Sequence, residues 1–297
     1  MITLVGEVLA DLFPHESVLG GAPFNVARHL QAFGLHPLMI SRRGQDALGK
    51  NLLSEMTRLG MITSGIQCDS RYPTGQVKVH LEHGNHRFEI LPDQAYDHID
   101  AGIAQLAIMQ IKPSLLYFGT LAQRNKPSRL AIDQMIAGSD CLKFLDINLR
   151  SPWYDKHTIR GSLARADVVK MNEDELDIVA HFFRLEGSTA EARSKALLKQ
   201  FALEKLLITC GDQGAWLLDS TEEILRTGPA LVVGSLVDTV GAGDAFATVF
   251  IIGLLHHWPT ALTLQRANHF AAALCGIRGG APENHDFYAA FIKAWLV

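Results

Sequence analysis

The chain alternates short apolar runs with amphipathic segments, and this alternation constrains the fold more than any other feature. The first apolar run, residues 1–14, is followed by a segment at 20–34 whose apolar positions keep helical spacing. Residues 36–44 and 46–60 repeat the same order, and glycine ends each amphipathic segment. Strands that alternate with helices usually pair in parallel, because each helix returns the chain to the same edge of the sheet. The sequence therefore predicts an α/β fold, with a mostly parallel sheet flanked by helices.

Residues 72–92 break this rhythm. Apolar and polar residues alternate there, Val77 and Val79 share one side, and the chain turns at 83–85. A period of two predicts a hairpin with one solvated face. Further apolar runs then extend the parallel sheet; they are residues 114–121, 142–150, 166–172 and 205–219. We therefore expect a single α/β domain with a small antiparallel sheet inserted as a lid or a dimer surface.

Composition argues against several classes of function. Hydrophobic residues make up 48% and charged residues 20% of the 297 residues, which suits a globular protein with a large core. The net charge of -4 and the lack of a basic run argue against nucleic-acid binding. The longest apolar stretch, residues 245–255, is far shorter than the ~20 residues that span a bilayer. We therefore expect no nucleic-acid partner and no membrane insertion.

The cysteines indicate the compartment. No two of them form a C-x-x-C pair, and we find no signal peptide in the sequence. Scattered thiols in a chain of this size are typical of reduced cytoplasmic proteins. We therefore expect a cytoplasmic protein with reduced thiols at Cys68, Cys141, Cys210 and Cys275.

The stretch DTVGAGDAF, residues 238–246, carries the strongest sign of chemistry. Gly241, Ala242 and Gly243 open a predicted buried helix, whose first amides and dipole favour an anion. Asp244 follows in the first turn, where a carboxylate beside a bound phosphate is costly unless it takes part in the reaction. Such a carboxylate can take the proton of a hydroxyl that attacks the γ-phosphoryl group of a nucleotide. The alternative is an ordinary helix start with an aspartate that the dipole stabilises.

A second glycine-containing stretch, GQDALGKN at residues 44–51, nearly matches a phosphate-binding loop. Its last position is Asn51, so the hydroxyl that would bind Mg²⁺ is missing. Asp46 is well placed to cap a helix that starts at the next residue. We therefore interpret this stretch as a capped helix.

Several motifs together resemble the ribokinase-like (PfkB-type) carbohydrate kinases, and most of all their bacterial fructokinase branch. DTVGAGDAF resembles the C-terminal signature of that family, and GGAPFNVARHLQAFG, residues 20–34, resembles its N-terminal signature. Shorter matches follow in the order of the fructokinase branch: GEVLADLFP, YPTG, FGTL, LDINLRSPWY, KMNEDEL and TCGDQGAW. The resemblance implies a ribokinase-like fold, with residues 1–297 as a single kinase domain. A lid would be formed by a small β-sheet of about residues 12–18 and 72–95.

The resemblance also implies catalytic and sugar-binding roles. The catalytic base would be Asp244, and the anion hole would consist of Gly241, Ala242 and Gly243. The residues around the sugar would be Asp11, Gly20, Gly21 and Asn25 at its hydroxyls, Phe88 of the lid as an apolar contact, and Arg150 near the sugar or the transferring phosphoryl group. From the residues alone, Asp11 can equally be a loop carboxylate and Asn25 a helix-surface amide. Arg150 can equally belong to a surface ion pair.

On the nucleotide side, the resemblance places Asn172 and Glu175 near Mg²⁺ and the phosphates, with Glu175 acting on the metal through water. From the residues alone, their spacing favours a capping arrangement at a helix start. The other nucleotide-binding residues would be Thr209, Gly211, Gly214 and Asn268. The two glycines also suit a plain turn between strands. Asp238 would lie near a monovalent cation such as K⁺.

The activity implied by the resemblance is that of an ATP-dependent sugar kinase with Mg²⁺ as cofactor. The leading reaction converts D-fructose to fructose 6-phosphate. The alternatives within the family are kinases of 2-keto-3-deoxygluconate, ribose or a nucleoside. The alternative from another class is a non-catalytic sugar-binding regulatory protein. The expected partners are a sugar, ATP and a second copy of the chain, bound as a homodimer through the lid.

Overall fold

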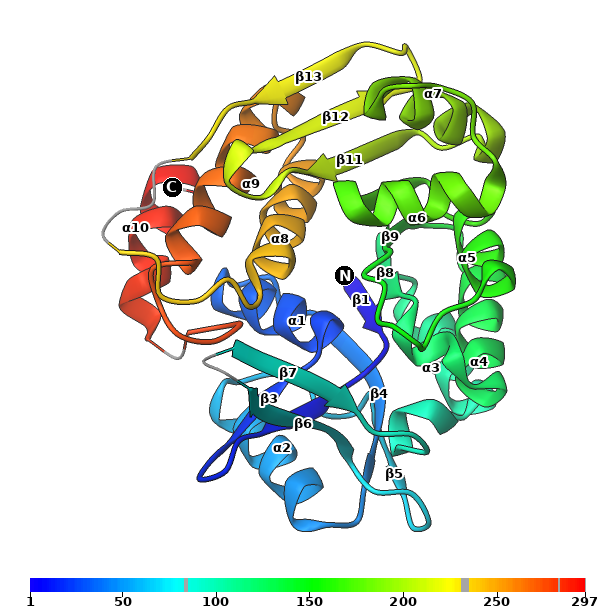
Figure 1. Ribbon diagram of the computed structural model, residues 1–297. Coiled ribbons are helices and arrows are strands. Elements are labelled where there is room, and N and C mark those ends of the chain that lie inside the picture. Colours follow the sequence, from blue (N-terminus) through cyan, green and yellow to red (C-terminus); the bar gives the residue numbers. More distant parts are fainter. Residues whose placement is uncertain (83–84, 231–234, 283, 297) are drawn as a thin grey trace. The chain divides into compact units, whose positions relative to one another are not determined.

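The computed structural model describes residues 1–82, 85–230, 235–282 and 284–296. Within these residues the larger of two sheets has nine strands, in the order β13-β12-β11-β10-β9-β8-β1-β4-β5 (Figure 1). The pairs β1–β4, β4–β5, β9–β10 and β10–β11 are parallel, whereas β11–β12 and β12–β13 are antiparallel. The bounds are β1 (Ile2–Val5), β4 (Leu38–Gly44), β5 (Ile66–Asp69), β8 (Leu115–Gly119), β9 (Leu142–Asp146), β10 (Val168–Asn172), β11 (Lys205–Thr209), β12 (Ala215–Asp219) and β13 (Ile224–Thr227). The predicted mostly parallel sheet is confirmed.

The chain divides into two compact units. The first comprises Met1–Leu116, Ala122–Cys141 and Asn284–Val297, and the second comprises Tyr117–Leu121 and Leu142–Glu283. The helices of the first unit are α1 (Ala22–Ala32), α2 (Ala47–Arg58), α3 (Ala101–Ile111), α4 (Lys126–Ala137) and α10 (His285–Trp295). The second unit contains α5 (Lys156–Leu163), α6 (Glu173–Phe183), α7 (Ala190–Phe201), α8 (Ala242–Leu255) and α9 (Thr260–Leu274). The short 3-10 helices are η1 (Ala95–His98), η2 (Leu121–Arg124) and η3 (Gly211–Gln213).

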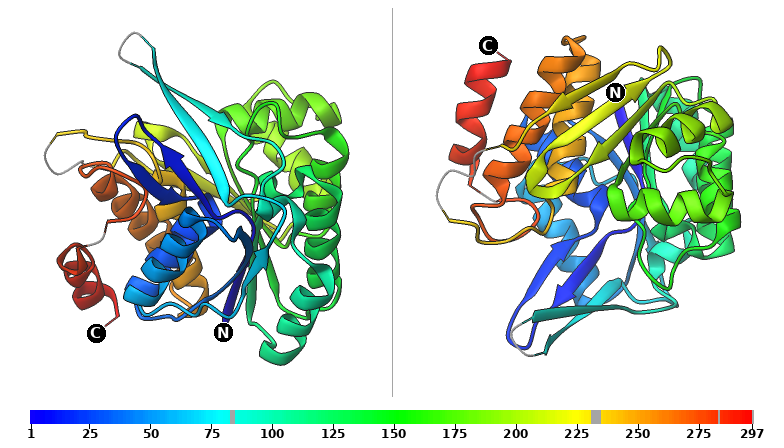
Figure 2. Two further views of the ribbon diagram at one scale, coloured as in Figure 1. Left: turned by 90° about the horizontal axis from the view of Figure 1, so that it is seen from below. Right: turned by 45° about the horizontal axis from the view of Figure 1, so that its top comes forward.

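The smaller sheet belongs to the first unit and has the order β3-β2-β6-β7. Its strands are β2 (Leu9–Leu12), β3 (Ser17–Gly20), β6 (Gly75–Glu82) and β7 (Asn85–Ile90). Figure 2 shows the β2–β3 and β6–β7 ribbons side by side, as the parallel pairing of β2 with β6 requires. In the antiparallel pairing of β6 with β7, Val79 lies opposite Phe88. Val77 and Val79 are buried and Lys78 between them is exposed, so the predicted alternation is confirmed on β6. Positions 83 and 84 of the predicted turn lie outside the described residues.

One strand boundary differs from the sequence-based expectation. The first apolar run does not form one strand: Ile2–Val5 joins the large sheet, and Leu9–Leu12 joins the small one. The chain bends at Gly6, where φ is 154° and a Cβ would lie 2.6 Å from the Cγ of Pro23. The small sheet therefore starts at Leu9, before the predicted lid segment at about 12.

The predicted helices at 20–34 and 46–60 form as α1 and α2. The Asp46 carboxylate caps α2 by accepting a hydrogen bond from the Gly49 amide at 2.8 Å. The stretch that nearly matches a phosphate-binding loop is thus a capped helix, as its residues predict.

The core of the second unit is built around α8. This helix is apolar on all sides, and its residues from Asp244 to Gly253 are buried. Helix α9 runs beside α8 (Figures 1 and 2). A Cβ at Gly253 on α8 would collide with the side chain of Thr263 on α9. No helix among the described residues is long and apolar enough to span a membrane.

Candidate active site

The start of α8 has the geometry of an anion site. Gly241 caps the helix with a φ of 79°, and a side chain there would collide with the backbone of Gly280. Among the described residues, the amides of Gly241 and Gly243 have no hydrogen-bond acceptor, as expected at the start of a helix. The amide of Ala242, the third predicted member of the anion hole, instead donates a hydrogen bond to the Thr239 carbonyl at 3.3 Å. Asp244, the third residue of α8, is only 9% exposed. The structure thus confirms the predicted glycine-opened helix and buries the candidate base in its first turn.

A buried lysine lies against this helix start. Lys170 on β10 forms an ion pair with Asp146 on β9, with 2.9 Å between Nζ and Oδ2. A Cβ on Gly243 would lie 3.2 Å from Nζ, so the ammonium group lies beside the first turn of α8. Burial opposes its charge, but the pKa of Lys170 is raised by three carboxylates, those of Asp146, Glu175 and Asp244. A stable positive charge therefore sits beside the candidate anion site.

Asn172 and Glu175 form a capping box at the start of α6. The Asn172 Oδ1 accepts a hydrogen bond from the Glu175 amide at 2.8 Å, and the Glu175 Oε2 accepts one from the Asn172 amide at 2.9 Å. The Glu175 Oε1 also accepts a hydrogen bond from the Leu149 amide at 2.7 Å. Burial raises the pKa of Glu175, against the opposing effect of Lys170. The capping interpretation is confirmed, and the metal role stays a prediction.

The other predicted nucleotide-side residues lie at a turn and on a helix. Thr209 ends β11, and the chain passes through η3 before Gly214 leads into the antiparallel strand β12. A Cβ on Gly214 would collide with the Thr227 carbonyl oxygen. The turn interpretation is therefore confirmed here. On α9, the buried Asn268 donates a hydrogen bond from Nδ2 to the Gly228 carbonyl at 2.9 Å.

Asp238 and Arg150 occupy more exposed positions. The Asp238 carboxylate accepts hydrogen bonds from the amides of Val240 and Gly279, each at 3.0 Å, and so joins two loops. Arg150 is exposed; its Nη1 donates a hydrogen bond to the Leu149 carbonyl at 3.3 Å, and the described residues offer it no ion-pair partner. Among those residues, no group of three or more histidine, cysteine, aspartate or glutamate side chains could hold a metal ion.

The predicted sugar-binding residues lie in the first unit. The Asp11 Oδ2 lies 3.3 Å from the position that a Cβ on Gly20 would take. Gly21 caps α1, and a Cβ there would lie 2.7 Å from the carbonyl oxygen of the buried Glu7. Asn25 is buried in the first turn of α1. The structure thus brings the Asp11 carboxylate of β2 close to Gly20 at the end of β3, and Gly21 and the buried Asn25 follow directly in the chain.

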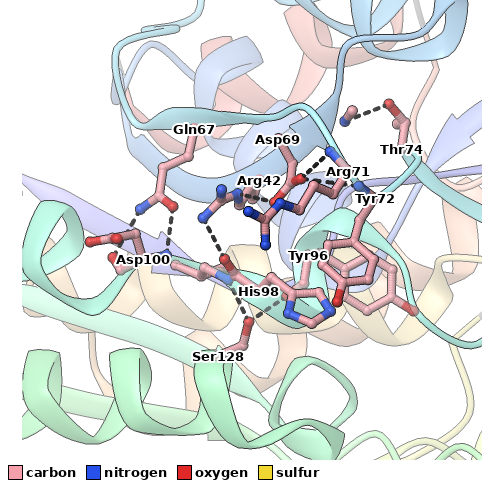
Figure 3. A network of polar contacts seen from close by, with 12 residues as sticks. Arg42, Gln67, Asp69, Arg71, Tyr72, Thr74, Tyr96, His98, Asp100 and Ser128 are labelled. Carbon is pink, nitrogen blue, oxygen red and sulfur yellow. Dashed lines mark hydrogen bonds and ion pairs between the residues drawn. The ribbon is translucent and has the colours of Figure 1, made fainter.

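The first unit also contains a cavity of about 500 Å³. No predicted site residue lines it; its lining consists of Arg42, Asp69, Ser70, Arg71, Tyr72, His98, Ile99, Asp100, Ala101, Pro127 and Leu130. The polar groups of its wall are largely engaged with one another (Figure 3).

The network in this wall holds the loop between β5 and β6. The Arg42 Nε lies 2.7 Å from the Asp69 Oδ2, and its Nη1 donates a hydrogen bond to the His98 carbonyl at 2.7 Å (Figure 3). The Asp69 Oδ1 accepts hydrogen bonds from the amides of Arg71 and Tyr72, and the Tyr72 ring stacks on His98 with centroids 3.6 Å apart. This loop leads into β6, so we interpret the network as the support of the small sheet.

Sequence reasoning missed the Lys170–Asp146 pair. A signal was present, because Lys170 interrupts the apolar run ADVVKMN and Asp146 ends the apolar strand LKFLD. A charged residue inside a buried strand requires a partner. The partner could not be named without the order of the strands.

Comparison with known proteins places the chain in a family. The model of the pfkB family of carbohydrate kinases matches residues 11–286. A protein of Pyrococcus horikoshii named as a sugar kinase is 30% identical over 275 residues, which cover 86% of this chain and 83% of the relative. A fructokinase of Vibrio alginolyticus is 29% identical over 275 residues, with 86% and 84% covered.

Solved structures agree with this relationship. The crystal structure of the P. horikoshii sugar kinase in complex with ATP has a TM-score of 0.76 to this chain at 26% identity, with 94% of each chain covered. The chain belongs to the PfkB family of carbohydrate kinases. It is therefore a phosphotransferase that acts on a sugar, and the predicted ribokinase-like fold is confirmed.

Proposed function

We propose that this kinase transfers the γ-phosphoryl group of ATP to O6 of D-fructose. The observation that carries the proposal is the buried Asp244 carboxylate, which follows the Gly241 and Gly243 amides, for which the described part of the chain offers no acceptor. An aspartate in the first turn of a helix is common, but one beside these two amides and beside a charged lysine is suited to proton abstraction near a phosphate. Because the chain belongs to a family of carbohydrate kinases, the proton that Asp244 abstracts would come from a sugar hydroxyl.

In this mechanism Asp244 accepts the proton of the attacking hydroxyl. The amides of Gly241 and Gly243 donate hydrogen bonds to the charge on the migrating phosphoryl group. The fixed amides need no reorganisation during the reaction, so their contribution is made in the transition state.

Glu175 is the residue that would act on Mg²⁺. Its oxygens already accept two backbone hydrogen bonds, which fits an indirect contact through water better than a direct one. When bound, Mg²⁺ would neutralise charge on the phosphates. Thr209, Gly211, Gly214 and Asn268 would line the nucleotide, and Asp238 would face K⁺.

On the sugar side, we propose that Asp11 and Asn25 hold the hydroxyl groups, with the Gly20 and Gly21 backbone close to them. A carboxylate and an amide together provide both acceptors and donors for a polyol. Fructose is favoured because the V. alginolyticus relative is a fructokinase. The same polar set also suits 2-keto-3-deoxygluconate, ribose or a nucleoside, which therefore stay alternatives.

The first test is the variant Asp244→Asn. We expect kcat to fall by about 10²- to 10⁴-fold, because the amide cannot take the proton, while ATP binding is kept. Steady-state ADP release and calorimetric ATP titration measure the two quantities. A matched control is Asp286→Asn, which alters another first-turn aspartate, on α10, and should leave kcat unchanged. Near-normal turnover of the Asp244 variant would reject the assignment.

The second test addresses the sugar. ADP release is measured with fructose, ribose, 2-keto-3-deoxygluconate, nucleosides and fructose 6-phosphate. The proposal expects the highest kcat/KM for fructose, and a higher value for another acceptor would replace it. Sugar binding without ADP release from any acceptor would support the non-catalytic alternative.

A further inference from the structure

We propose that Lys170 is a positioning residue for phosphoryl transfer, because its ammonium group, clamped by Asp146, supports the Gly243 backbone and places a fixed positive charge beside the anion hole. The inference deepens the proposed function and rests on it for the nature of the reaction. Its structural basis lies within the second unit.

The clamp on Lys170 is geometrically tight. Its Nζ donates hydrogen bonds to both oxygens of Asp146, at 3.0 Å to Oδ1 and 2.9 Å to Oδ2. The two residues lie directly opposite each other on the parallel strands β9 and β10. The Tyr117 hydroxyl donates a further hydrogen bond to the Asp146 Oδ2 at 3.2 Å. The Lys170 and Asp146 side chains are 7% and 1% exposed, so water does not screen the pair.

The ammonium group also reaches the helix start. With a Cβ position on Gly243 only 3.2 Å from Nζ and 3.8 Å from Cε, any side chain at 243 would press on the lysine. Absence of a side chain at 243 therefore has two effects. An anion can approach the Gly243 amide, and the Lys170 charge can approach the same turn.

Stability alone does not explain the pair. Burying two charges costs free energy that their attraction often fails to recover, and apolar replacements of such pairs are often neutral or stabilising. Here the Lys170 ammonium group also interacts electrostatically with two further carboxylates, Glu175 and Asp244, both of which are buried. The buried Lys170 ammonium group offsets the repulsion that these carboxylates would exert on a phosphoryl group at this turn. The positive charge of Lys170 therefore stabilises the negative charge of the phosphoryl group in the transition state.

The decisive experiment uses the double variant Lys170→Met/Asp146→Asn. It removes both charges at nearly constant volume, and the new side-chain amide keeps an acceptor oxygen for the Tyr117 hydroxyl. We expect a folded protein whose thermal midpoint is close to that of the wild type. We expect kcat to fall about 10- to 100-fold, with the sugar KM and the ATP Kd within about threefold of the wild type.

A second readout separates positioning from mere folding. The probe is a complex of ADP, aluminium fluoride and the sugar that the wild type phosphorylates. In this complex the aluminium fluoride imitates the transferring phosphoryl group. We expect its affinity to fall by about the same factor as kcat, whereas the affinity for ADP alone is kept. The matched control is Lys205→Met on the neighbouring strand β11, which should change neither quantity.

Gly243→Ala tests the contact itself. The added methyl group should push Lys170 away and lower kcat about tenfold, and the loss should be smaller in the Lys170→Met background. Wild-type kcat and fluoride-complex affinity in the double variant would overturn the inference, as would wild-type kcat in Gly243→Ala. Failure of the wild type to phosphorylate any sugar would instead reject the proposed function.

Discussion

At the scale of single residues, Asn172 and Glu175 show how one side chain can serve both structure and chemistry. Each completes the capping box of α6, which satisfies two amides that a helix start leaves open. A carboxylate oxygen can accept more than one hydrogen bond, so the cap does not exhaust Glu175. The capping and metal interpretations are therefore compatible.

The cysteines provide a prediction at the same scale. Burial is the main cause that raises the pKa of Cys210 to about 11, and the Glu173 carboxylate adds to it. At pH 8 only about one Cys210 in 10³ is then a thiolate, the form that reacts. We expect iodoacetamide to modify the exposed Cys68 long before Cys210, as measured by peptide mass spectrometry. Faster labelling of Cys210 in the folded protein would contradict this, and denatured protein serves as the control.

At the scale of elements, Asp46 links two segments that are far apart in the sequence. Its Oδ1 caps α2, and its two oxygens accept hydrogen bonds from the Thr74 hydroxyl at 2.6 Å and the Thr74 amide at 2.7 Å. Thr74 directly precedes β6. The cap of one helix therefore also fixes the start of the small sheet.

We expect Asp46→Ala to destabilise the protein by about 1–3 kcal/mol, because a cap and two further hydrogen bonds are lost. Urea unfolding measures the loss. Thr74→Val is the control, since it keeps the cap and should cost less. An Asp46→Ala variant as stable as the wild type would contradict the assignment.

The same residue has a defined pH dependence. Burial tends to raise the pKa of Asp46, but hydrogen bonds from Thr74 and Gly49 hold this pKa below its usual value of 3.8. A carboxyl with a lowered pKa stabilises the fold above its unfolded pKa, and this stabilisation is lost as the pH falls through the folded pKa. The difference between the wild type and Asp46→Ala should thus be constant near neutral pH and shrink only below 3.8.

At the scale of the whole molecule, we expect a homodimer that forms through the small sheet, which would also serve as the lid of a single kinase domain. Phe88 on β7 is 46% exposed, and Val18 on β3 is 37% exposed. Phe88→Asp should shift the protein toward the monomer in sedimentation velocity runs, because a charge at an apolar contact must be desolvated. Ile103→Asp on α3 is the control, since Ile103 is a 56% exposed apolar residue outside this sheet. Dissociation by the control alone would place the interface on α3 instead.

Much of the fold could be predicted, because strands and helices leave local patterns. The glycine stops after α1 and α2, the Asp46 cap and the apolar length of α8 are all encoded within a few residues. Strand β13 was not predicted, because the sequence EEILRT has little apolar alternation. The strand is held by its antiparallel pairing with β12. The division of the first apolar run into β1 and β2 was not predicted either, because it depends on the close approach of Gly6 and Pro23.

The sequence by itself determined the alternation of strands and helices, the capped helix starts and the carboxylate that follows the glycine turn at α8. These features are local, since periodicity and backbone conformation act between neighbours in the chain. Only the tertiary structure decided that Lys170 faces Asp146 across two strands and lies beside Gly243 on a helix much later in the chain. Such contacts follow from strand order and packing, and a local pattern contains neither.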